Sequence, residues 1–342
     1  MIVEMAPSAQ DIEQIEAVAR AAEAVDDVAP LGEQPLRALR TAGEAGASDA
    51  AGAGDETGVR HLLSRDGDAA DAEVVGYAQV AGSGADATAE LVVHPDHRRR
   101  GIGTGLLRAV LEREAGVAVW AHGALPGAVA LAEGLGLTRT RELLKMRRRA
   151  ADGPALPERR HVEGIELGTL AEAASETASE GASRGARGGG RWRGLDARAE
   201  FLRVNNAAFH WHPEQGGWTP AQLDERLAVD WVDTGAIFLA VDVAGGAGGA
   251  AAPRLAGFHW TKTVAEPGEP VEGEVYVVAV DPADQGRGLG GVLTSLGVEH
   301  LEGPAGAESV VLYVEGDNAP AIRTYEKLGF TVDSIDVTYA SV

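Results

Sequence analysis

The chain of 342 residues contains no cysteine. This absence excludes disulfide bonds, thiolate nucleophiles and zinc sites with cysteine ligands, and it fits a reducing compartment. Positive charge is scarce as well, because 30 lysines and arginines face 52 aspartates and glutamates and leave a formal net charge of −22. With this balance, we do not expect binding of a nucleic-acid backbone or an anionic membrane through bulk electrostatics.

Long apolar runs are also missing. No stretch reaches the roughly 18 apolar residues of a membrane span, and the N-terminal segment carries acidic residues but no basic region. We therefore expect a cytoplasmic monomer whose partners are small molecules, not nucleic acid or a membrane. An apolar content of 45% is enough for buried cores, and the length predicts about two domains of roughly 150 residues each.

Three segments contain few of the large apolar residues that packing requires. They are residues 41–58, 171–190 and 244–253, which consist mainly of alanine, glycine and charged or small polar residues. This composition is typical of flexible surface insertions.

A different kind of break marks the domain boundary. Residues 147–164 combine charge with two prolines and two glycines and separate two regions of structured character. We predict a first domain at residues 1–150, a linker at 151–163 and a second domain at 164–342.

The two predicted domains share an internal repeat. LVVHPDHRRRGIGTGLLRAVLE at 91–112 resembles VVAVDPADQGRGLGGVLTSLGVEHLE at 277–302, with an offset of 187 that pairs Gly101 with Gly288. Further along, residues 117–137 resemble 309–330 at an offset of 193. Each copy reads as a β-branched strand, a turn with proline, a glycine-rich loop and an amphipathic helix. Two matched blocks in the same order indicate homologous domains in tandem.

The glycine-rich loops are candidate anion sites. A strand that enters a helix through glycines directs several N–H groups and the positive helix end at one point, which suits a pyrophosphate. A single such loop is equally consistent with a tight turn, and the second copy favours a nucleotide-like ligand. A dinucleotide fold is the main alternative, because Gly286-x-Gly288-x-x-Gly291 has the Rossmann spacing and Glu315 ends the next apolar run. Against it, residues 281–284 separate the strand from the first glycine, and the first copy breaks the spacing.

Two motifs resemble the GNAT superfamily of N-acetyltransferases. They are the loops RRRGIG at 98–103 and QGRGLG at 285–290, and the segment NAPAIRTYEKLGF at 318–330, which is similar to the closing motif of that superfamily. The resemblance implies two α/β domains, each a mixed β-sheet flanked by helices, with acetyl-CoA as co-substrate. It assigns acetyl-CoA binding to Leu91, Val92, Val93, Arg98, Arg99, Arg100, Gly101, Ile102, Gly103, Thr104, Val278, Ala279, Val280, Gln285, Gly286, Arg287, Gly288, Leu289, Gly290, Gly291, Asn318, Ala319, Pro320, Ala321, Ile322 and Arg323.

A narrower resemblance covers nearly the whole chain. GEQPLRAL at 32–39 and VNNAAFHWHPEQGGWT at 204–219 are similar to segments of the mycothiol synthases, a tandem family within that superfamily. These enzymes acetylate the cysteinyl amine of a cysteine-glucosamine-inositol pseudo-disaccharide, which completes mycothiol. The resemblance implies that function here. The alternatives are an acetyltransferase for another small amine or a peptide N-terminus, and a non-catalytic acyl-CoA sensor.

Acyl transfer to an amine requires a base for the ammonium proton and a hydrogen-bond donor for the departing sulfur. The resemblance implies that Glu274, just ahead of the cofactor strand, is the base and that Tyr325, in the closing motif, contacts the sulfur. The two offsets map these positions onto Ala87 and Ala132, neither of which transfers a proton. We therefore expect that catalysis belongs to the second domain and that the first only binds the co-substrate. With a small shift in the alignment of the two copies, Glu90 would partly replace Glu274.

The resemblance also implies a set of acceptor-binding residues, which are Glu33, Glu214, Lys262, Glu274 and Tyr313. Glu33 differs from the others because it lies in the first predicted domain. Five of the six tryptophans fall in the second half; this suits a carbohydrate-facing site, although core packing is the commoner explanation.

No metal site is predicted. His210 and His212 would point the same way from a strand, but no third ligand clusters with them. Direct transfer from acetyl-CoA needs no covalent enzyme intermediate, which agrees with the lack of cysteine.

Overall fold

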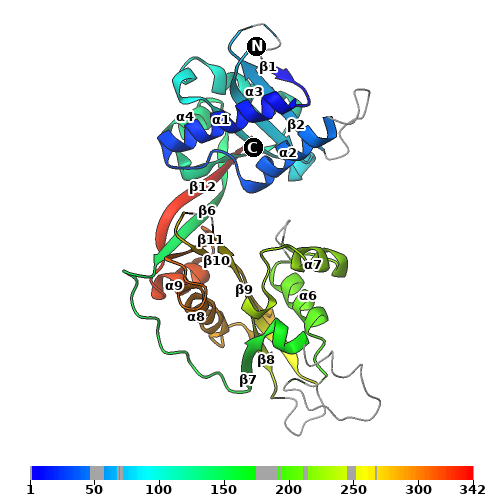
Figure 1. Ribbon diagram of the computed structural model, residues 1–342, viewed down its shortest axis with the longest axis vertical. Helices are drawn as coiled ribbons and strands as arrows, with labels where there is room; N and C mark the ends of the chain where they lie inside the picture. The colour runs from blue at the N-terminus through cyan, green and yellow to red at the C-terminus, as the bar shows by residue number, and fades with distance from the viewer. Residues whose placement is uncertain are drawn as a thin grey trace. The chain divides into compact units, whose positions relative to one another are not determined.

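The computed structural model describes residues 2–46, 58–67, 69, 72–174, 192, 194–210, 215–244, 252–265 and 268–341. The chain forms two compact units (Figure 1). The first comprises Met1–Leu144 together with Ser334–Val342, and the second comprises Lys145–Asp333. The predicted linker 151–163 lies within the second unit, and the last strand of the chain completes the first.

The first unit is a mixed sheet with helices on both faces. Its strands follow the order β1-β2-β3-β4-β5-β12-β6, in which β4 and β5 are parallel and β12 pairs with β5 antiparallel. Helix α1 begins with a capping box between Ser8 and Asp11. The elements are β1 (Ile2–Glu4), α1 (Ala9–Asp26), α2 (Glu33–Gly46), β2 (Val59–Arg65), β3 (Val74–Ala81), β4 (Thr88–Val93), α3 (Ile102–Arg113), β5 (Ala118–Ala121), α4 (Pro126–Gly134), residues 138–144 of β6 (Thr138–Arg149) and residues 334–340 of β12 (Thr331–Ala340).

The second unit has the same architecture. Its strands follow the order β6-β11-β10-β9-β8-β7, with β10 and β11 parallel and β7 to β10 antiparallel. Besides the remaining parts of β6 and β12, the elements are β7 (Ile165–Thr169), α6 (Ala197–Ala208), α7 (Pro220–Leu227), β8 (Ile237–Asp242), β9 (Arg254–Val264), β10 (Glu272–Val280), α8 (Leu289–Glu302), β11 (Ser309–Glu315) and α9 (Ala319–Lys327).

The predicted repeat is confirmed at the level of single elements. Helix α3 begins directly after Gly101 and α8 directly after Gly288, while α4 and α9 are related by an offset of 193 at both ends. A short 3-10 turn precedes each glycine loop, at Pro95–His97 and Pro282–Asp284.

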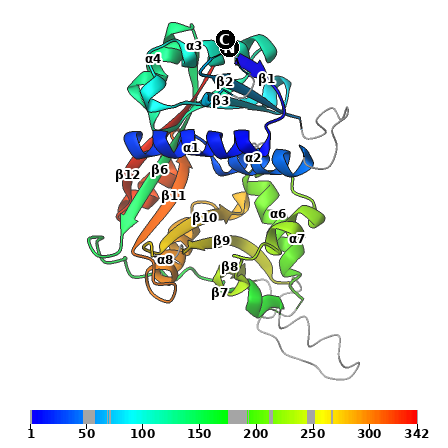
Figure 2. The ribbon, with the colours of Figure 1, turned by 45° about the horizontal axis from the view of Figure 1, so that its top comes forward.

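Two hydrophobic clusters fix the second sheet between its helices. On one face, Phe258 of β9 stacks on Phe201 of α6 with ring centroids 3.8 Å apart, and Trp260 packs in the same cluster. On the other face, Phe238 of β8 packs with Leu293 of α8. Figures 1 and 2 show α6 and α7 together on one side of β8 and β9 and α8 on the other. The second sheet, which contains β10 and β11, therefore lies between two layers of helices.

Two of the predicted insertions begin later than expected. Residues 41–46 continue helix α2, and residues 171–174 are helical, with Ala173 buried. The prediction of flexible coil there was wrong, because alanine-rich sequence extends a helix readily once a neighbouring amphipathic segment has nucleated it. Residues 58, 244, 252 and 253 lie outside helices and strands, and 47–57, 175–190 and 245–251 lie outside the described residues.

Candidate active site

The parallel strands β10 and β11 diverge along their length. Their pairing runs from Glu272 opposite Ser309 to Glu274 opposite Val311, although β10 continues to Val280. In the described part of the sheet, the side of β10 that faces β11 is therefore not used for strand pairing beyond Glu274. Strands β4 and β5 diverge in the same way after Ala89 and Val119. The opening between such strands offers backbone hydrogen-bonding groups to an extended ligand.

The glycine loop and the start of α8 form a candidate cradle for an anion. Gly286 and Gly288 have φ values of +81° and +85°, a left-handed conformation that glycine adopts without strain. Gly288 caps α8 without a side-chain hydrogen bond, so the first-turn N–H groups keep their hydrogen-bonding capacity for a ligand. A Cβ at Gly290 would meet only Val280 Cγ2 at 4.0 Å, so there is open space at the helix start for a phosphate.

The first unit repeats this cradle with one difference. Gly101 has a φ of +82°, but the position equivalent to Gly286 is Arg99, which holds a φ of +63° despite its side chain. Arg98 donates to both carboxylate oxygens of Asp26, at 2.8 and 2.6 Å. Arg99 and Arg100 are exposed.

Arg287 is held by neighbouring groups of the protein itself. Its Nη1 atom donates to Asp284 Oδ1 at 2.5 Å and its Nη2 atom donates to the carbonyl of Glu163 at 3.0 Å. Asp284 also accepts from Arg254, and although burial alone would raise the pKa of this carboxyl, the two arginines hold it below its usual value. Arg287 therefore braces the loop, and much of its charge is compensated by Asp284.

Glu274 and Lys262 form a cross-strand pair at the point where β10 and β11 part. They lie directly opposite each other on β10 and β9, and Lys262 Nζ stands 3.8 Å from Glu274 Oε2. Both side chains are mostly buried, with 17% and 18% of their surfaces exposed. The ammonium of Lys262 also lies 5.3 Å from the ring centre of Trp231 and 5.7 Å from that of Tyr276.

Tyr276 occupies a β-bulge. The register of β10 against β9 shifts between Val275 and Val277, whereas β4 pairs with β3 without interruption. The bulge changes the correspondence between the units by one residue, so the equivalent of Glu274 is Thr88 and not Ala87. The predicted mapping onto Ala87 was wrong, because a constant offset ignores the inserted residue. Thr88 is not an acid either.

Tyr325 lies on α9, the helix after the diverging strand β11. Its ring packs edge-on against Phe330, with centroids 6.0 Å apart, and burial raises the pKa of its hydroxyl to about 12. The tyrosine therefore remains a neutral hydrogen-bond donor at physiological pH. In the first unit the same helix position is the buried Ala132. Asn318, a predicted acetyl-CoA contact, caps α9 by accepting from the Ala321 N–H at 3.2 Å.

The residues predicted to bind the acceptor do not all belong to one unit. Tyr313, 46% exposed, lies two residues after Val311 on β11, so it shares a sheet face with Glu274. Glu33 lies in the first turn of α2 in the first unit and pairs with Arg37 at 3.5 Å. Glu214 lies outside the described residues.

Comparison with known proteins identifies the chain. The Acetyltransferase (GNAT) family model matches residues 203–330, and the Acetyltransferase (GNAT) domain model matches residues 65–136. A mycothiol acetyltransferase of Mycolicibacterium gilvum is 45% identical over 96% of this chain and 94% of its own. That of Rhodococcus erythropolis is 44% identical over 96% and 95%. The chain belongs to the mycothiol acetyltransferase family. It is an N-acetyltransferase with two GNAT domains, as predicted.

Solved structures agree with the tandem fold of this mycothiol acetyltransferase family member. A GCN5-related N-acetyltransferase from Sphaerobacter thermophilus superposes with a TM-score of 0.64 at 21% identity, covering 99% of this chain and 94% of its own. A tandem GNAT protein from the clavulanic acid biosynthesis pathway gives a TM-score of 0.58 at 19% identity, covering 99% and 98%. At these identities the likeness shows the fold.

The first unit of this mycothiol acetyltransferase homologue contains a polar cluster that the sequence did not predict. His122 after β5 contacts Glu90 of β4 and Asp336 of β12, each at 3.3 Å. Glu90 accepts from the Gly32 N–H at 2.7 Å, and Trp120 stacks flat on the His122 ring. Burial alone would lower the pKa of His122, but the two carboxylates raise it to about 9. Glu90 thus accepts from Gly32 and contacts His122. No local sequence pattern could show that Glu90 and Asp336, which are far apart in the chain, contact the same histidine.

Three of the six tryptophans belong to the hydrophobic core of the second unit. Trp192, Trp218 and Trp260 are buried in one cluster, and Trp211 lies outside the described residues. A carbohydrate-facing role was therefore wrong for these three. Among the described tryptophans, Trp231 lies beside Lys262. Within the described ranges, no group of three metal-ligating side chains and no helix that could cross a membrane is found.

Proposed function

We propose that this protein transfers the acetyl group of acetyl-CoA to the cysteinyl amine of the cysteine-glucosamine-inositol pseudo-disaccharide, the last step of mycothiol biosynthesis. The observation that carries the proposal is 45% identity with a mycothiol acetyltransferase over 96% of the chain. The Glu274–Lys262 pair at the divergence of β10 and β11 supports it. The acceptor carries a thiol, so we further propose that the enzyme works in the reducing cytoplasm. We also propose that it is a monomer.

The residues of the second unit fit acetyl-CoA. The cradle of Gly286, Gly288 and Gly290 has the left-handed turns and the open helix start that a pyrophosphate requires. The unpaired side of β10, at Val278–Val280, suits the amide groups of the pantetheine arm. When bound, acetyl-CoA supplies the acetyl group as a thioester.

The reacting groups of the protein have complementary tasks. Glu274 accepts the proton that the ammonium of the acceptor must lose before its nitrogen can bond to the acetyl carbon. As the carbon–sulfur bond breaks, the nitrogen releases its second proton to solvent and the hydroxyl of Tyr325 donates a proton to the sulfur. Tyr325 is then reprotonated from solvent, to which Glu274 also returns the proton it accepted. A neutral Tyr325 suits this role, because its raised pKa keeps the proton in place until the sulfur becomes anionic. Lys262 and Tyr313 orient the acceptor on the same sheet face.

The first unit retains the cradle without the reacting pair. Thr88 and Ala132 stand where the second unit has Glu274 and Tyr325, and Glu90 is bound to His122 and Gly32. We propose that this unit binds acetyl-CoA without catalysing transfer. Calorimetric titration with CoA tests the binding, since two sites per chain are expected and a single site would contradict a working cradle in the first unit.

The main test is a product assay. The protein is incubated with acetyl-CoA and a panel of amines that includes the pseudo-disaccharide. Products are followed by mass spectrometry, because the acceptor and its product both carry a thiol that reacts with the colorimetric reagents used to detect released CoA. Acetylation of the pseudo-disaccharide supports the proposal. Acetylation of unrelated amines only would indicate a different acetyltransferase, and CoA binding without any product would indicate a sensor.

A further inference from the structure

A cavity in the second unit adjoins the glycine loop of the proposed acetyl-CoA site. It has a volume of about 220 Å³, which is below the roughly 300–1,000 Å³ of a pocket that encloses a whole drug-sized ligand. It therefore has room for one end of a larger molecule. Its lining combines apolar and basic side chains, which are Val162, Ile165, Leu167, Val292, Arg159, Arg160 and His161.

Two contacts connect this cavity with the cradle. The Nη1 atom of Arg160 lies 3.8 Å from the position that a Cβ of Gly288 would occupy. Val292 lies one helical turn after Gly288, to whose carbonyl its N–H donates at 3.3 Å. A ligand whose phosphates rest on the start of α8 can thus continue directly into the cavity.

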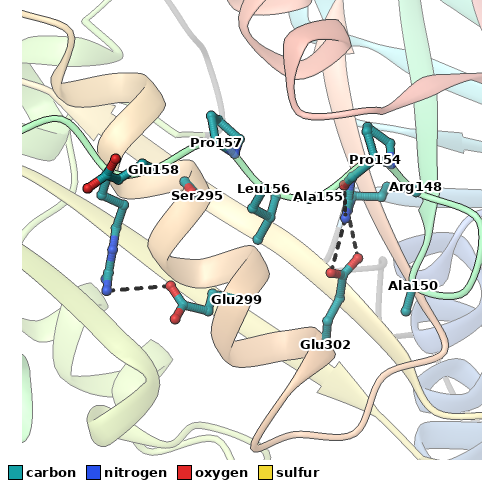
Figure 3. A pocket seen from close by; sticks show the side chains of 12 residues that line it. Arg148, Ala150, Pro154, Ala155, Leu156, Pro157, Glu158, Ser295, Glu299 and Glu302 are labelled. Carbon is teal, nitrogen blue, oxygen red and sulfur yellow. Dashed lines mark hydrogen bonds and ion pairs between the residues drawn. The ribbon is translucent and has the colours of Figure 1, made fainter.

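The linker that carries the basic residues is fixed along α8. Arg148, which is buried, donates to Glu302 at 2.7 Å and to the carbonyl of Pro154 at 2.8 Å, and Arg159 pairs with Glu299 at 3.5 Å. Figure 3 shows Leu156 and Pro157 passing beside Ser295 and Glu299 of α8, where a larger cavity of about 570 Å³ follows the later turns of the helix. At the far end, Glu163 accepts from Arg287. Arg160 is therefore presented by a segment anchored on both sides.

Arg160 differs from the other arginines near the cradle in its charge balance. Arg287 and Arg254 share Asp284, and Arg159 pairs with Glu299. Arg160 is exposed, and no carboxylate among the residues that the structure describes pairs with it. An arginine with this freedom presents a planar set of donors that matches a phosphate.

We propose that this cavity binds the 3′-phosphoadenosine end of acetyl-CoA in the second unit, with the adenine ring against Val162, Leu167 and Val292 and the 3′-phosphate on Arg160. The inference rests on the proposed function, which puts the pyrophosphate at the cradle. Apolar walls beside an uncompensated arginine suit a heterocycle that carries a phosphate better than a free anion, which would gain nothing from the walls. Arg160 is accordingly a specificity residue that distinguishes CoA from its 3′-dephospho form.

The test compares acetyl-CoA with acetyl-3′-dephospho-CoA in steady-state acetylation of the pseudo-disaccharide. For the wild type we expect a KM about tenfold lower for acetyl-CoA. For Arg160→Gln we expect this ratio to fall close to one, through a rise in the KM for acetyl-CoA with kcat unchanged. Arg198→Gln removes the same charge from α6, where Arg198 pairs with Asp224, and should keep the wild-type ratio.

An equal rise of both KM values in Arg160→Gln, or a wild type that does not discriminate between the two co-substrates, would overturn the inference. Failure of the proposed function has a different signature, which is a wild type that acetylates no amine in the panel. In that case, calorimetric affinities for CoA and 3′-dephospho-CoA provide the same comparison without turnover, and loss of discrimination in Arg160→Gln still decides it.

Discussion

Lys262 lies directly opposite Glu274 across β9 and β10, with its ammonium 3.8 Å from the carboxylate. The same ammonium faces the rings of Trp231 and Tyr276. The pair therefore has a cation held between a carboxylate and two aromatic faces, which limits the positions that Glu274 can take. Tyr276, whose ring lies beside the ammonium of Lys262, is also the inserted residue of the β-bulge. The bulge therefore contributes to the geometry of the proposed catalytic pair.

Replacement of Glu274 by glutamine should reduce kcat/KM for the pseudo-disaccharide by about a hundredfold or more, since general-base catalysis contributes roughly that factor. The amide keeps the shape of the side chain but cannot take the ammonium proton. Glu272→Gln is the matched control, because Glu272 lies on the same strand and face but pairs with Arg147 at 2.5 Å. Its turnover should be unchanged. Full turnover of Glu274→Gln would contradict the assignment.

Tyr325→Phe should lower kcat by about a hundredfold while the KM values change little, because the hydroxyl is needed only as the sulfur departs. Since the pKa of Tyr325 is raised to about 12, its ionisation should add no limb to the pH–rate profile of the wild type between pH 6 and about pH 10. Tyr339→Phe, in the core of the first unit, should retain wild-type kcat. A kcat loss in the wild type that follows a pKa near 10 would argue against a Tyr325 that stays neutral.

His122 should make the stability of the first unit depend on alkaline pH. Its folded pKa of about 9 exceeds the ordinary 6.5, so the stabilisation is fully present below pH 6.5 and is lost as the pH rises through 9. At about 1.36 kcal/mol per pKa unit, the contribution is on the order of 3 kcal/mol. Urea unfolding of the wild type and His122→Gln should differ most near pH 6 and converge above pH 10.

The fluorescence of Trp120 gives this measurement a local signal, because Trp120 stacks on His122 and the other five tryptophans belong to the second half of the chain. A difference in unfolding free energy between the wild type and His122→Gln that stays constant from pH 6 to pH 10 would show that the imidazolium is not the stabilising species.

Gly290→Ala should separate stability from function. An alanine in the first turn of α8 has room for its Cβ, with the nearest atom 4.0 Å away, and should stabilise the helix by about 0.5–1 kcal/mol. The same methyl group would occupy the space proposed for a phosphate, so the KM for acetyl-CoA should rise at least tenfold. Gly297→Ala on the same helix is the contrasting variant, because its Cβ would collide with the buried ring of His259 and should destabilise the fold. An unchanged KM in Gly290→Ala would contradict the cradle.

The repeat, the glycine loops and the closing helices could be predicted from the sequence because each depends on local chemistry. Gly101 and Gly288 are required by a left-handed backbone, and a strand before and a helix after them follow from side-chain periodicity. These local signals recur at fixed offsets, so they also revealed the duplication.

The remaining features depend on residues far apart in the chain. Nothing in VYVVAV at 275–280 indicates that Tyr276 is the inserted residue, since the bulge is defined by pairing with β9. The sequence likewise gives no sign that Arg287 donates to the carbonyl of Glu163, or that Asp336 reaches His122. Such contacts are set by tertiary packing, which local patterns do not encode.

Strand β12 has a consequence for how the protein is made. Val337 and Tyr339 pair with Ala121 and Val119 of β5, so the first unit gains this strand from residues that are synthesised after the whole second unit. Domains generally fold in the order of their synthesis, but here the N-terminal unit is incomplete until β12 has been synthesised. Until then β5 presents an open edge, which is the type of surface that invites wrong pairing in a nascent chain.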